Sequence, residues 1–392
     1  MTLNRKTIFP FLLVFFEMVT YLSSDMYLPA IPDVMKTFHL TPGQAQLSLT
    51  FWFIGAMSLQ LFLGPISERF GRRSVLCIGT CIFTLSSLGC ALATTYPLFL
   101  VFRCIQGSGI SFMAVPGYAS IHESYDQKTA IKLMALMGSI AIIAPAFGPL
   151  VGSLIMLHVS WQAIFLFITG WALLASILLI KFMPETLPPN QRVASDLKAT
   201  VSSYASIFKN PQFMRLLTIY GLLFCAFLIW ILAGPFLVIS WFNRSPLLFG
   251  YYQILIFMSY ILANYLVKFL IDKMSAENLL SLGLLLCLFI SILALIYTYL
   301  NPTHLLGFVI FYMLFSFCSA FAFGPLNRIT IEASTAPMGA RTAVFSLGLN
   351  TFSSLGSVLM TLLYRGPMLT LTLMMTILLC LCLLINWRNK AR

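Results

Sequence analysis

Runs of about twenty apolar residues follow one another along this chain and constrain its fold more than any other feature. A helix of that length crosses a hydrocarbon core of about 30 Å and satisfies its own backbone hydrogen bonds, which lipid cannot do. The sequence therefore predicts an all-α membrane protein with twelve transmembrane helices. The expected spans are 8–30, 43–66, 74–94, 97–120, 130–157, 161–183, 212–241, 248–271, 277–299, 303–326, 340–363 and 367–387.

The composition requires lipid around such a fold. Of the 392 residues, 60% are apolar and 9% are charged, and the mean hydropathy is +0.94. A water-soluble globule cannot cover that much hydrocarbon surface. The net charge of +12 would suit a nucleic-acid-binding protein if the basic residues clustered on one face. They are spread over the breaks between apolar runs instead, so we expect a lipid bilayer as partner and no nucleic acid.

The basic residues also predict the orientation, because cytoplasmic loops keep the positive charge. With the N-terminus inside, most of the 23 Lys and Arg residues fall in inner loops or termini. An even number of spans returns the chain to the same side. We therefore expect a multi-pass protein with both termini in the cytoplasm.

One long break separates the first six expected spans from the last six. Residues 184–211 contain four prolines among polar and charged residues. We predict an N-terminal six-helix bundle over 1–183, a cytoplasmic linker over 184–211 and a C-terminal six-helix bundle over 212–392. Two such halves with a substrate site near the bilayer midplane are a known transporter layout.

Two carboxylates interrupt the first expected span. Glu17 and Asp25 lie there, with Tyr21 between them. A carboxylate at membrane depth is costly and usually faces a cavity or a partner on an ion or substrate route. Eight residues of helix separate the two by about 12 Å and rotate them by about 80°, so both can line one cavity at two depths. The alternative is a structural pair that holds helices together by hydrogen bonds.

Only one base lies more than one helical turn inside an expected span. Arg103 is on the fourth span, near its outer end, and Asp25 is near the outer end of the first. These helices run in opposite directions, so the two side chains should reach similar depths and form a pair or a water-bridged contact. A structural lock without a transport role is the alternative interpretation.

Two glycine-rich strings are more specific than general membrane-helix composition. The loop after the second span combines a tight glycine turn with arginines and an acid, whereas a simple topology signal needs the positive charge alone. Its marked residues are Gly64, Glu68, Arg69, Gly71, Arg72 and Arg73. Glycines and prolines of the fifth span permit close contact and bending. They are Gly138, Pro145, Gly148, Pro149 and Gly152. For the fifth span alone, generic helix packing explains the pattern equally well.

These strings resemble the signatures of the major facilitator superfamily. The loop resembles the signature between its second and third helices, with Glu68 where Asp is usual, and the string from Arg103 to Gly107 resembles its fourth-helix arginine motif. The fifth span is similar to its antiporter motif but ends in Gly-Ser. The first span looks closest to MdfA-type multidrug antiporters in the Bcr/CflA-like drug:proton antiporter group. The resemblance covers essentially the whole chain and implies the major facilitator fold.

The resemblance also implies roles for residues. Glu17 and Asp25 would handle protons and cargo together with Tyr21, and Arg103 would be coupled to both acids. The drug pocket would include four further residues, which are Met57, Met137, Ala141 and Ile142. The loop string would form a cytoplasmic gate. The protein would be a monomeric antiporter of the bacterial inner membrane that exports lipophilic cationic and neutral drugs, with a proton gradient as its energy source and no cofactor.

Several alternatives remain open from the sequence. The same fold suits an exporter dedicated to one endogenous metabolite, such as a siderophore, and sodium can replace protons at carboxylates. A channel or receptor is disfavoured, because repeated rings of polar residues are not visible. An enzyme and a bound metal are disfavoured, because the four histidines show no metal-ligand spacing. A nucleotide-driven pump would need a phosphate-binding loop, and the sequence has no such motif.

Overall fold

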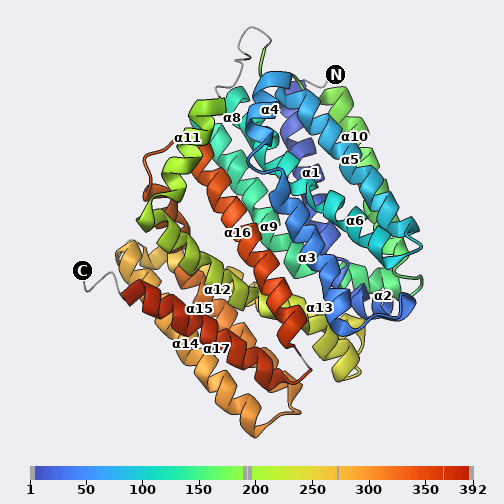
Figure 1. Cartoon of the computed structure of the whole chain (residues 1–392), viewed down its shortest axis with the longest axis vertical. Coiled ribbons are helices and arrows are strands. Elements are labelled where there is room, and N and C mark those ends of the chain that lie inside the picture. Colours follow the sequence, from blue (N-terminus) through green and yellow to red (C-terminus); the bar gives the residue numbers. More distant parts are fainter. Residues whose placement is uncertain (1–4, 189–191, 193–196, 272, 365, 388–392) are drawn as a thin grey trace. The chain divides into compact units, whose positions relative to one another are not determined.

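The computed structural model describes residues 5–188, 192, 197–271, 273–364 and 366–387, and every regular element in these ranges is helical (Figure 1). The chain divides into two compact units. Unit 1 consists of Met1–Ala30 and Ser48–Ser202, and unit 2 of Ile31–Leu47 and Ser203–Arg392. Helix α11 (Leu197–Phe208) contains the division. The predicted boundaries at 183 and 212 stay a prediction.

The expected spans are found in the structure. In the described residues, eleven helices are long and apolar enough to cross a membrane, and a bent pair makes up to twelve. That pair is α3 (Pro42–Ser58) with α4 (Leu63–Phe70), which meet at 50°. The all-α membrane fold is therefore confirmed, and the expected span 43–66 is broken after Ser58.

Unit 1 is built on the contacts of α1 with α9 and α10, and of α5 with α6 and α10. Its helices besides parts of α3 and α11 are α1 (Arg5–Asp25), η1 (Leu28–Ala30), α4, α5 (Arg72–Leu92), α6 (Tyr96–Gly107), α7 (Gly109–Phe112), the π-helical turn η2 (Met113–Gly117), α8 (Tyr118–Ser124), α9 (Gln127–Met156) and α10 (Gln162–Phe182).

Unit 2 is built on the contacts of α15 with α12, α13 and α14, and of α12 and α14 with α17. Unit 2 contains parts of α3 and α11. Its other elements are α2 (Ile31–Thr37), α12 (Pro211–Pro235), the π-helical segment η4 (Phe236–Trp241), α13 (Pro246–Leu270), α14 (Ala276–Leu300), α15 (Leu305–Glu332), α16 (Met338–Leu363) and α17 (Met368–Trp387).

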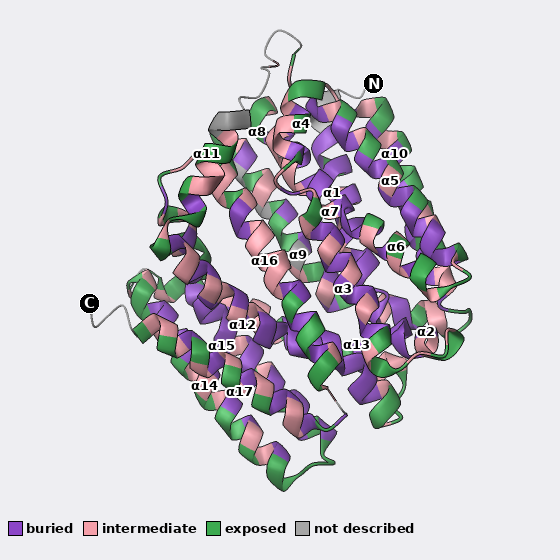
Figure 2. Cartoon of the chain, viewed as in Figure 1, coloured by how far each residue is buried: buried purple, intermediate pink, exposed green. Residues whose placement is uncertain are grey.

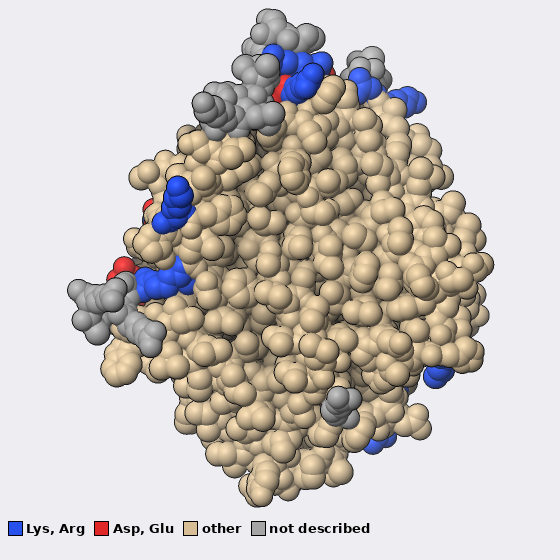
Figure 3. Space-filling view, in the orientation of Figure 1, with Lys and Arg blue, Asp and Glu red and all other residues tan. Residues whose placement is uncertain are grey.

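Apolar side chains lie both inside the units and on their surfaces. On α14, Leu285, Phe289 and Ile296 are more than half exposed, as lipid-facing residues are (Figure 2). In the view of Figure 3, the visible Lys, Arg, Asp and Glu atoms gather at the upper margin, along the left side and at the lower right, and the broad face between them is uncharged. This distribution is the one that a bilayer selects.

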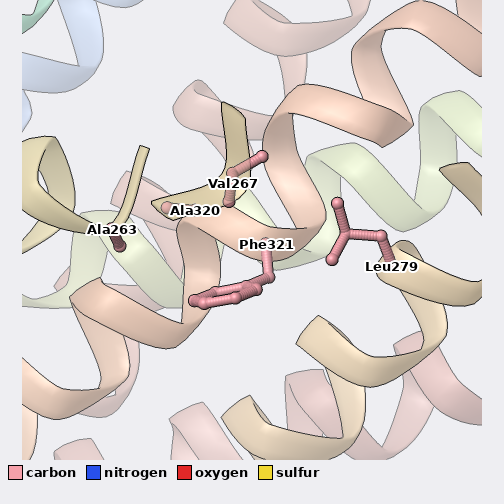
Figure 4. Close-up of a cluster of buried hydrophobic side chains, with 5 residues drawn as sticks. All are labelled: Ala263, Val267, Leu279, Ala320 and Phe321. Atoms are coloured by element: carbon pink, nitrogen blue, oxygen red, sulfur yellow. The ribbon is translucent and has the colours of Figure 1, made fainter. Parts of the chain in front are cut away.

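Three helices of unit 2 enclose a compact apolar cluster (Figure 4). Ala263 and Val267 of α13, Leu279 of α14, and Ala320 and Phe321 of α15 are all buried there. The two alanines leave room for the larger side chains, which is how membrane helices approach one another closely. The cluster fixes α13 and α14 against α15.

The expected fourth span, 97–120, is one helix in the prediction and four short elements in the structure. It runs from α6 through α7 and η2 to α8 and ends later, at Ser124. Pro116 lies inside the π-turn η2, where it removes a backbone donor from the helical ladder. Such π-turns recur at functional sites because they rotate the following side chains. Here the residue that follows is Tyr118.

Candidate functional site

Glu17 lies on α1 and is buried, with 2% of its surface exposed. The Tyr118 hydroxyl, at the start of α8, donates to Glu17 Oε1 at 2.5 Å. The other oxygen, Oε2, is sealed from solvent and has no hydrogen-bond partner in the described part of the chain. Glu17 therefore keeps one unused acceptor inside unit 1.

Asp25 ends α1 and is also buried, with 6% exposed. It lies against the glycines of α9. A Cβ atom added to Gly148 would come within 2.6 Å of the Asp25 Cβ, and one added to Gly152 would collide with the carbonyl oxygen of Met26. The missing side chains therefore let α9 contact the end of α1 directly.

Gly138, at the other end of the fifth-helix string, does not take part in this contact. Nothing lies within 4 Å of the place where Gly138 would carry a Cβ. Pro145 and Pro149 are within α9, and the Ser153 hydroxyl donates to the Pro149 carbonyl at 2.8 Å. The string is thus divided between one close helix contact and a more open part of α9.

Arg103 lies on α6 and is fully buried. Its Nη1 donates to the Ser23 carbonyl at 3.0 Å and to Gln106 Oε1 at 2.6 Å, and Nε reaches the Ser48 carbonyl at 3.4 Å. The guanidinium carbon stands 4.7 Å from the centre of the Tyr27 ring. A buried cation needs such a shell, because desolvation costs several kcal/mol or more.

The structure does not show the direct ion pair expected between Arg103 and Asp25. Within the described ranges, no Arg103 nitrogen lies within 4.0 Å of an Asp25 oxygen. Main-chain carbonyls and Gln106 accept from Nε and Nη1 instead, and Nη2 is buried with no hydrogen-bond partner among the described residues. Similar depth along two helices does not fix the direction in which each side chain points.

The expected pocket residues lie at different degrees of burial. Met137 is fully buried, whereas Tyr21, Met57 and Ile142 are half-buried. The side chain of Ala141 lies outside the described residues. That these residues share one drug pocket stays a prediction.

Arg72 organises the predicted gate loop. Its Nε donates to Glu123 Oε1 at 3.0 Å and its Nη1 to the Ser67 hydroxyl at 2.6 Å, while Glu68 Oε1 is 3.8 Å from Nη2. Glu123 is the second-last residue of α8, so the loop is tied to the helix that carries Tyr118. The Arg72 side chain is 10% exposed, which shields the pair with Glu123 from water.

The other marked residues of the loop have separate contacts. Arg73 Nη2 donates to the Ile180 carbonyl at 2.6 Å, near the end of α10. Arg69 is exposed and lies over the ring of Phe70. Gly64 has open space where a Cβ would be.

The linker docks on the same loop. Glu185 Oε1 accepts a hydrogen bond from the Arg72 backbone amide at 3.0 Å, and Glu185 Oε2 pairs with Arg192 Nη2 at 3.3 Å. The Thr186 hydroxyl donates to Glu123 Oε2 at 2.6 Å. Gly71 has φ 95°, and a Cβ there would come within 2.7 Å of Arg192 Nη2, so the loop needs glycine at this point.

Several of these partners were not among the predicted site residues. Tyr118 lies near the end of the expected fourth span, Glu123 follows that span, and Glu185 is one of the charged residues of the expected linker. Pro116 and Gly117 before Tyr118 were a usable signal for a break in the helix. No local pattern assigns the partner of a buried acid from another helix.

Solved structures show the same fold. The xylose transporter XylE from E. coli matches with a TM-score of 0.73 and 16% identity over 97% of both chains. The nucleoside transporter NupG matches with a TM-score of 0.74 and 15% identity over 99% of both chains. At this identity the likeness concerns the fold alone.

Sequence relatives are more similar. Multidrug transporter MdfA of Edwardsiella piscicida is 32% identical over 88% of this chain and 84% of its own length. Multidrug resistance protein MdtM of Salmonella typhimurium is 32% identical over 86% of this chain and 82% of its own. Chloramphenicol resistance protein CraA of Acinetobacter baumannii is 31% identical over 89% of this chain and 84% of its own.

The family model of the Major Facilitator Superfamily matches residues 13–361. This range contains the first-helix acids, Arg103, the gate loop and most of unit 2. Members of this family are transporters and not enzymes, which confirms the expectation from the sequence that the protein is not an enzyme. The chain therefore belongs to the major facilitator superfamily, as a multi-pass membrane transporter related to bacterial multidrug efflux proteins.

Proposed function

We propose that this protein is a proton-coupled antiporter that exports lipophilic cationic and neutral drugs by alternating access. The unused Oε2 atom of Glu17, beside the Tyr118 bond to Oε1, is the observation that carries the proposal. A buried carboxylate with one donor is poorly satisfied when ionised. A proton or a cationic cargo at Oε2 stabilises the carboxylate, and the proton and the cargo therefore compete for the same oxygen atom.

Asp25 and Arg103 complete the coupling. Asp25 is a second buried acid, so the site can hold different combinations of protons and cargo charge. Arg103 is a fixed positive charge at the Asp25 end of α1, bonded to the Ser23 carbonyl, and its field favours the ionised form of Asp25 without a direct ion pair. When the cargo is neutral, one acid binds or releases the exchanged proton while the other acid keeps its protonation state.

The cargo is expected to be lipophilic and varied. Tyr21, Met57, Met137, Ala141 and Ile142 form the proposed pocket, and methionine side chains repack around different shapes. The names of the relatives support drugs as cargo, because they describe multidrug transport and chloramphenicol resistance. We also infer a location in the bacterial inner membrane, cytoplasmic termini and a monomer.

Proton release from purified protein in detergent tests the proposal. Several unrelated cationic and neutral drugs should each release protons from the wild type, and the variant Glu17→Gln/Asp25→Asn should release none, because it lacks both acids. The control is Glu332→Gln, since Glu332 is 61% exposed at the end of α15 and pairs with Arg328. It should behave like the wild type.

Three results would change the proposal. Release by one metabolite alone would indicate a dedicated exporter. Exchange driven by sodium without proton release would replace the coupling ion. No release by any ligand would exclude competition between proton and cargo as the mechanism.

A further inference from the structure

Unit 2 contains a group of aromatic side chains centred on Phe323 of α15. From α12, the ring centres of Tyr220, Phe224 and Phe227 lie 5.1, 6.2 and 5.8 Å from that of Phe323. The spacing of four and then three residues places all three on one face of α12. One helix therefore presents three rings to the same partner.

Two further helices contribute rings. Tyr260 of α13 lies 6.2 Å from Phe323 and 5.8 Å from Phe227, and Phe345 of α16 lies 4.9 Å from Tyr220. We call these six residues the Phe323 cluster. Their pairs are mainly tilted or edge-to-face, the arrangements that aromatic rings favour. Four helices thus supply one aromatic surface within unit 2.

The cluster lies in one layer near the middle of the membrane. Tyr220 is nine residues after the start of α12, and Phe323 is nine residues before the end of α15. At about 1.5 Å per residue these distances are about 14 Å. Tyr260 is ten residues before the end of α13, about 15 Å by the same rise. Since successive spans alternate in direction, these helix ends lie on the same membrane side.

Tyr220 does not have the environment of a structural tyrosine. It is half-buried, and its hydroxyl makes no hydrogen bond in the described part of the chain. A buried phenol normally finds a partner, and lipid cannot supply one. Tyr312, on α15, shows the usual case, because its hydroxyl donates to the Ala226 carbonyl at 2.7 Å.

Packing fixes the opposite side of the cluster. Tyr260 packs against the apolar cluster of Figure 4, which includes Phe321, the residue two before Phe323. Tyr220, Phe224 and Tyr260 remain half-buried, whereas Phe227, Phe323 and Phe345 are buried. The exposed ring surface therefore belongs to three side chains on a rigid base.

The Phe323 cluster has no acid beside it. The acids of unit 2 within the described ranges are Asp33, Glu277 and Glu332, and they lie in the short helix α2, in the first turn of α14 and at the last residue of α15. Within the described residues of unit 2, the cluster therefore offers ring faces and the Tyr220 hydroxyl but no negative charge at its own depth. It suits aromatic ligands whether or not they carry a charge, because ring faces attract both rings and cations.

We propose that Tyr220, Phe224 and Tyr260, held in place by the buried Phe323 ring, recognise the aromatic part of the cargo, with the Tyr220 hydroxyl donating to an acceptor on it. The inference rests on the proposed export function and names its substrate class as aromatic compounds. The cluster sets the affinity for rings, and the acids of α1 set the response to charge.

Two phosphonium ions of equal charge test the stacking. Binding of tetraphenylphosphonium and tetrapentylphosphonium to purified protein is measured by calorimetry, in the wild type and in Phe224→Leu and Tyr260→Leu. Each lost ring contact should weaken the aromatic ion about fivefold and the aliphatic ion less than twofold. Phe289→Leu is the control, because Phe289 is 58% exposed on α14.

Tyr220→Phe tests the hydroxyl. Chloramphenicol, a neutral aromatic compound with hydrogen-bond acceptors, should bind about fivefold more weakly to this variant. Tetraphenylphosphonium has no acceptor and should bind as before. Tyr265→Phe is the matched control, since Tyr265 is 65% exposed on α13.

The outcomes separate the two proposals. Equal weakening of both phosphonium ions in folded Phe224→Leu, with an unchanged melting temperature, would overturn the aromatic site. Wild-type binding of the aromatic ion and of chloramphenicol by all variants would overturn it too. Absence of drug-induced proton release, with aromatic preference retained, would instead reject antiport while the recognition site stands.

Discussion

At the residue scale, the buried carboxylate of Glu17 depends on a partner from another helix. Tyr118 satisfies Oε1, and Oε2 is left for a proton or a cation. Arg103 shows the same principle with the opposite charge, because carbonyl oxygens and Gln106 stabilise it in place of an acid. In the described part of unit 1, Glu17 and Arg103 therefore have neutral hydrogen-bond partners and no directly paired opposite charge.

Replacing Tyr118 tests this dependence. Tyr118→Phe removes the sole donor to Glu17 Oε1 in the described structure, and a hydrogen bond to a charged group contributes about 1.5–3 kcal/mol. The affinity for cationic cargo should fall about tenfold or more, since it needs the ionised carboxylate, while neutral cargo changes little. Calorimetry with a cationic and a neutral drug measures both.

The matched control for this substitution is Tyr299→Phe, because Tyr299 is 73% exposed at the end of α14. It should leave both affinities unchanged. An equal loss for cationic and neutral cargo in Tyr118→Phe would mean that Tyr118 shapes the pocket and does not support the charge of Glu17.

At the scale of elements, small residues and interrupted helices position the site. The glycines at 148 and 152 allow α9 to pack against the end of α1. The π-turn η2 lies directly before Tyr118, which contacts Glu17. In unit 2, Gly234 and Pro235 lead into the π-helical segment η4. Helix interruptions at membrane depth are tolerated where protein surrounds them.

The contact between α1 and α9 can be tested by adding one methyl group. Gly152→Ala would drive a Cβ into the Met26 carbonyl, and overpacking of this kind costs about 1–3 kcal/mol. The melting temperature in detergent should fall, and drug transport should fall with it. Gly170→Ala on α10 should have no such effect, because nothing lies within 4 Å of its Cβ position. A stable, active Gly152→Ala would show that α9 moves away at no cost.

At the scale of the whole molecule, the segment between the two predicted halves is partly fixed to unit 1. Glu185 bonds to the Arg72 amide and pairs with Arg192, and Thr186 bonds to Glu123. The gate loop therefore contacts both α8, which carries Tyr118, and the beginning of the linker. A change in the conformation of the gate loop therefore acts on both α8 and the linker.

Trypsin measures how firmly the linker is held. In the wild type, Arg192 is tied to Glu185 and to the Leu187 carbonyl, which keeps its side chain from the protease. Glu185→Gln weakens the ion pair, so cleavage after Arg192 should become several-fold faster. Glu332→Gln, on an exposed acid of unit 2, serves as the control and should leave the rate unchanged. An unchanged rate in Glu185→Gln would show that the ion pair does not hold the linker.

More of the fold than of the candidate site could be predicted from the sequence. The spans can be predicted from hydropathy, because the free energy of placing a segment of about 20 residues in lipid depends on that segment alone. Glu17, Asp25 and Arg103 stand out for the same reason, since a charge at that depth is expensive wherever it points. The breaks after Ser58 and around Pro116 were missed, because prolines and glycines are common in membrane helices that continue.

The sequence alone thus determined the membrane environment, the spans, the buried ionisable residues and the family. Only the tertiary structure decided that Tyr118 bonds to Glu17, that Arg103 is held by carbonyls, and that Glu185 joins the gate loop. It also assembled the Phe323 cluster from four helices. The physical reason is that lipid exposure acts on each segment separately, whereas a partner depends on the rotation and bending of helices that are 80 or more residues apart.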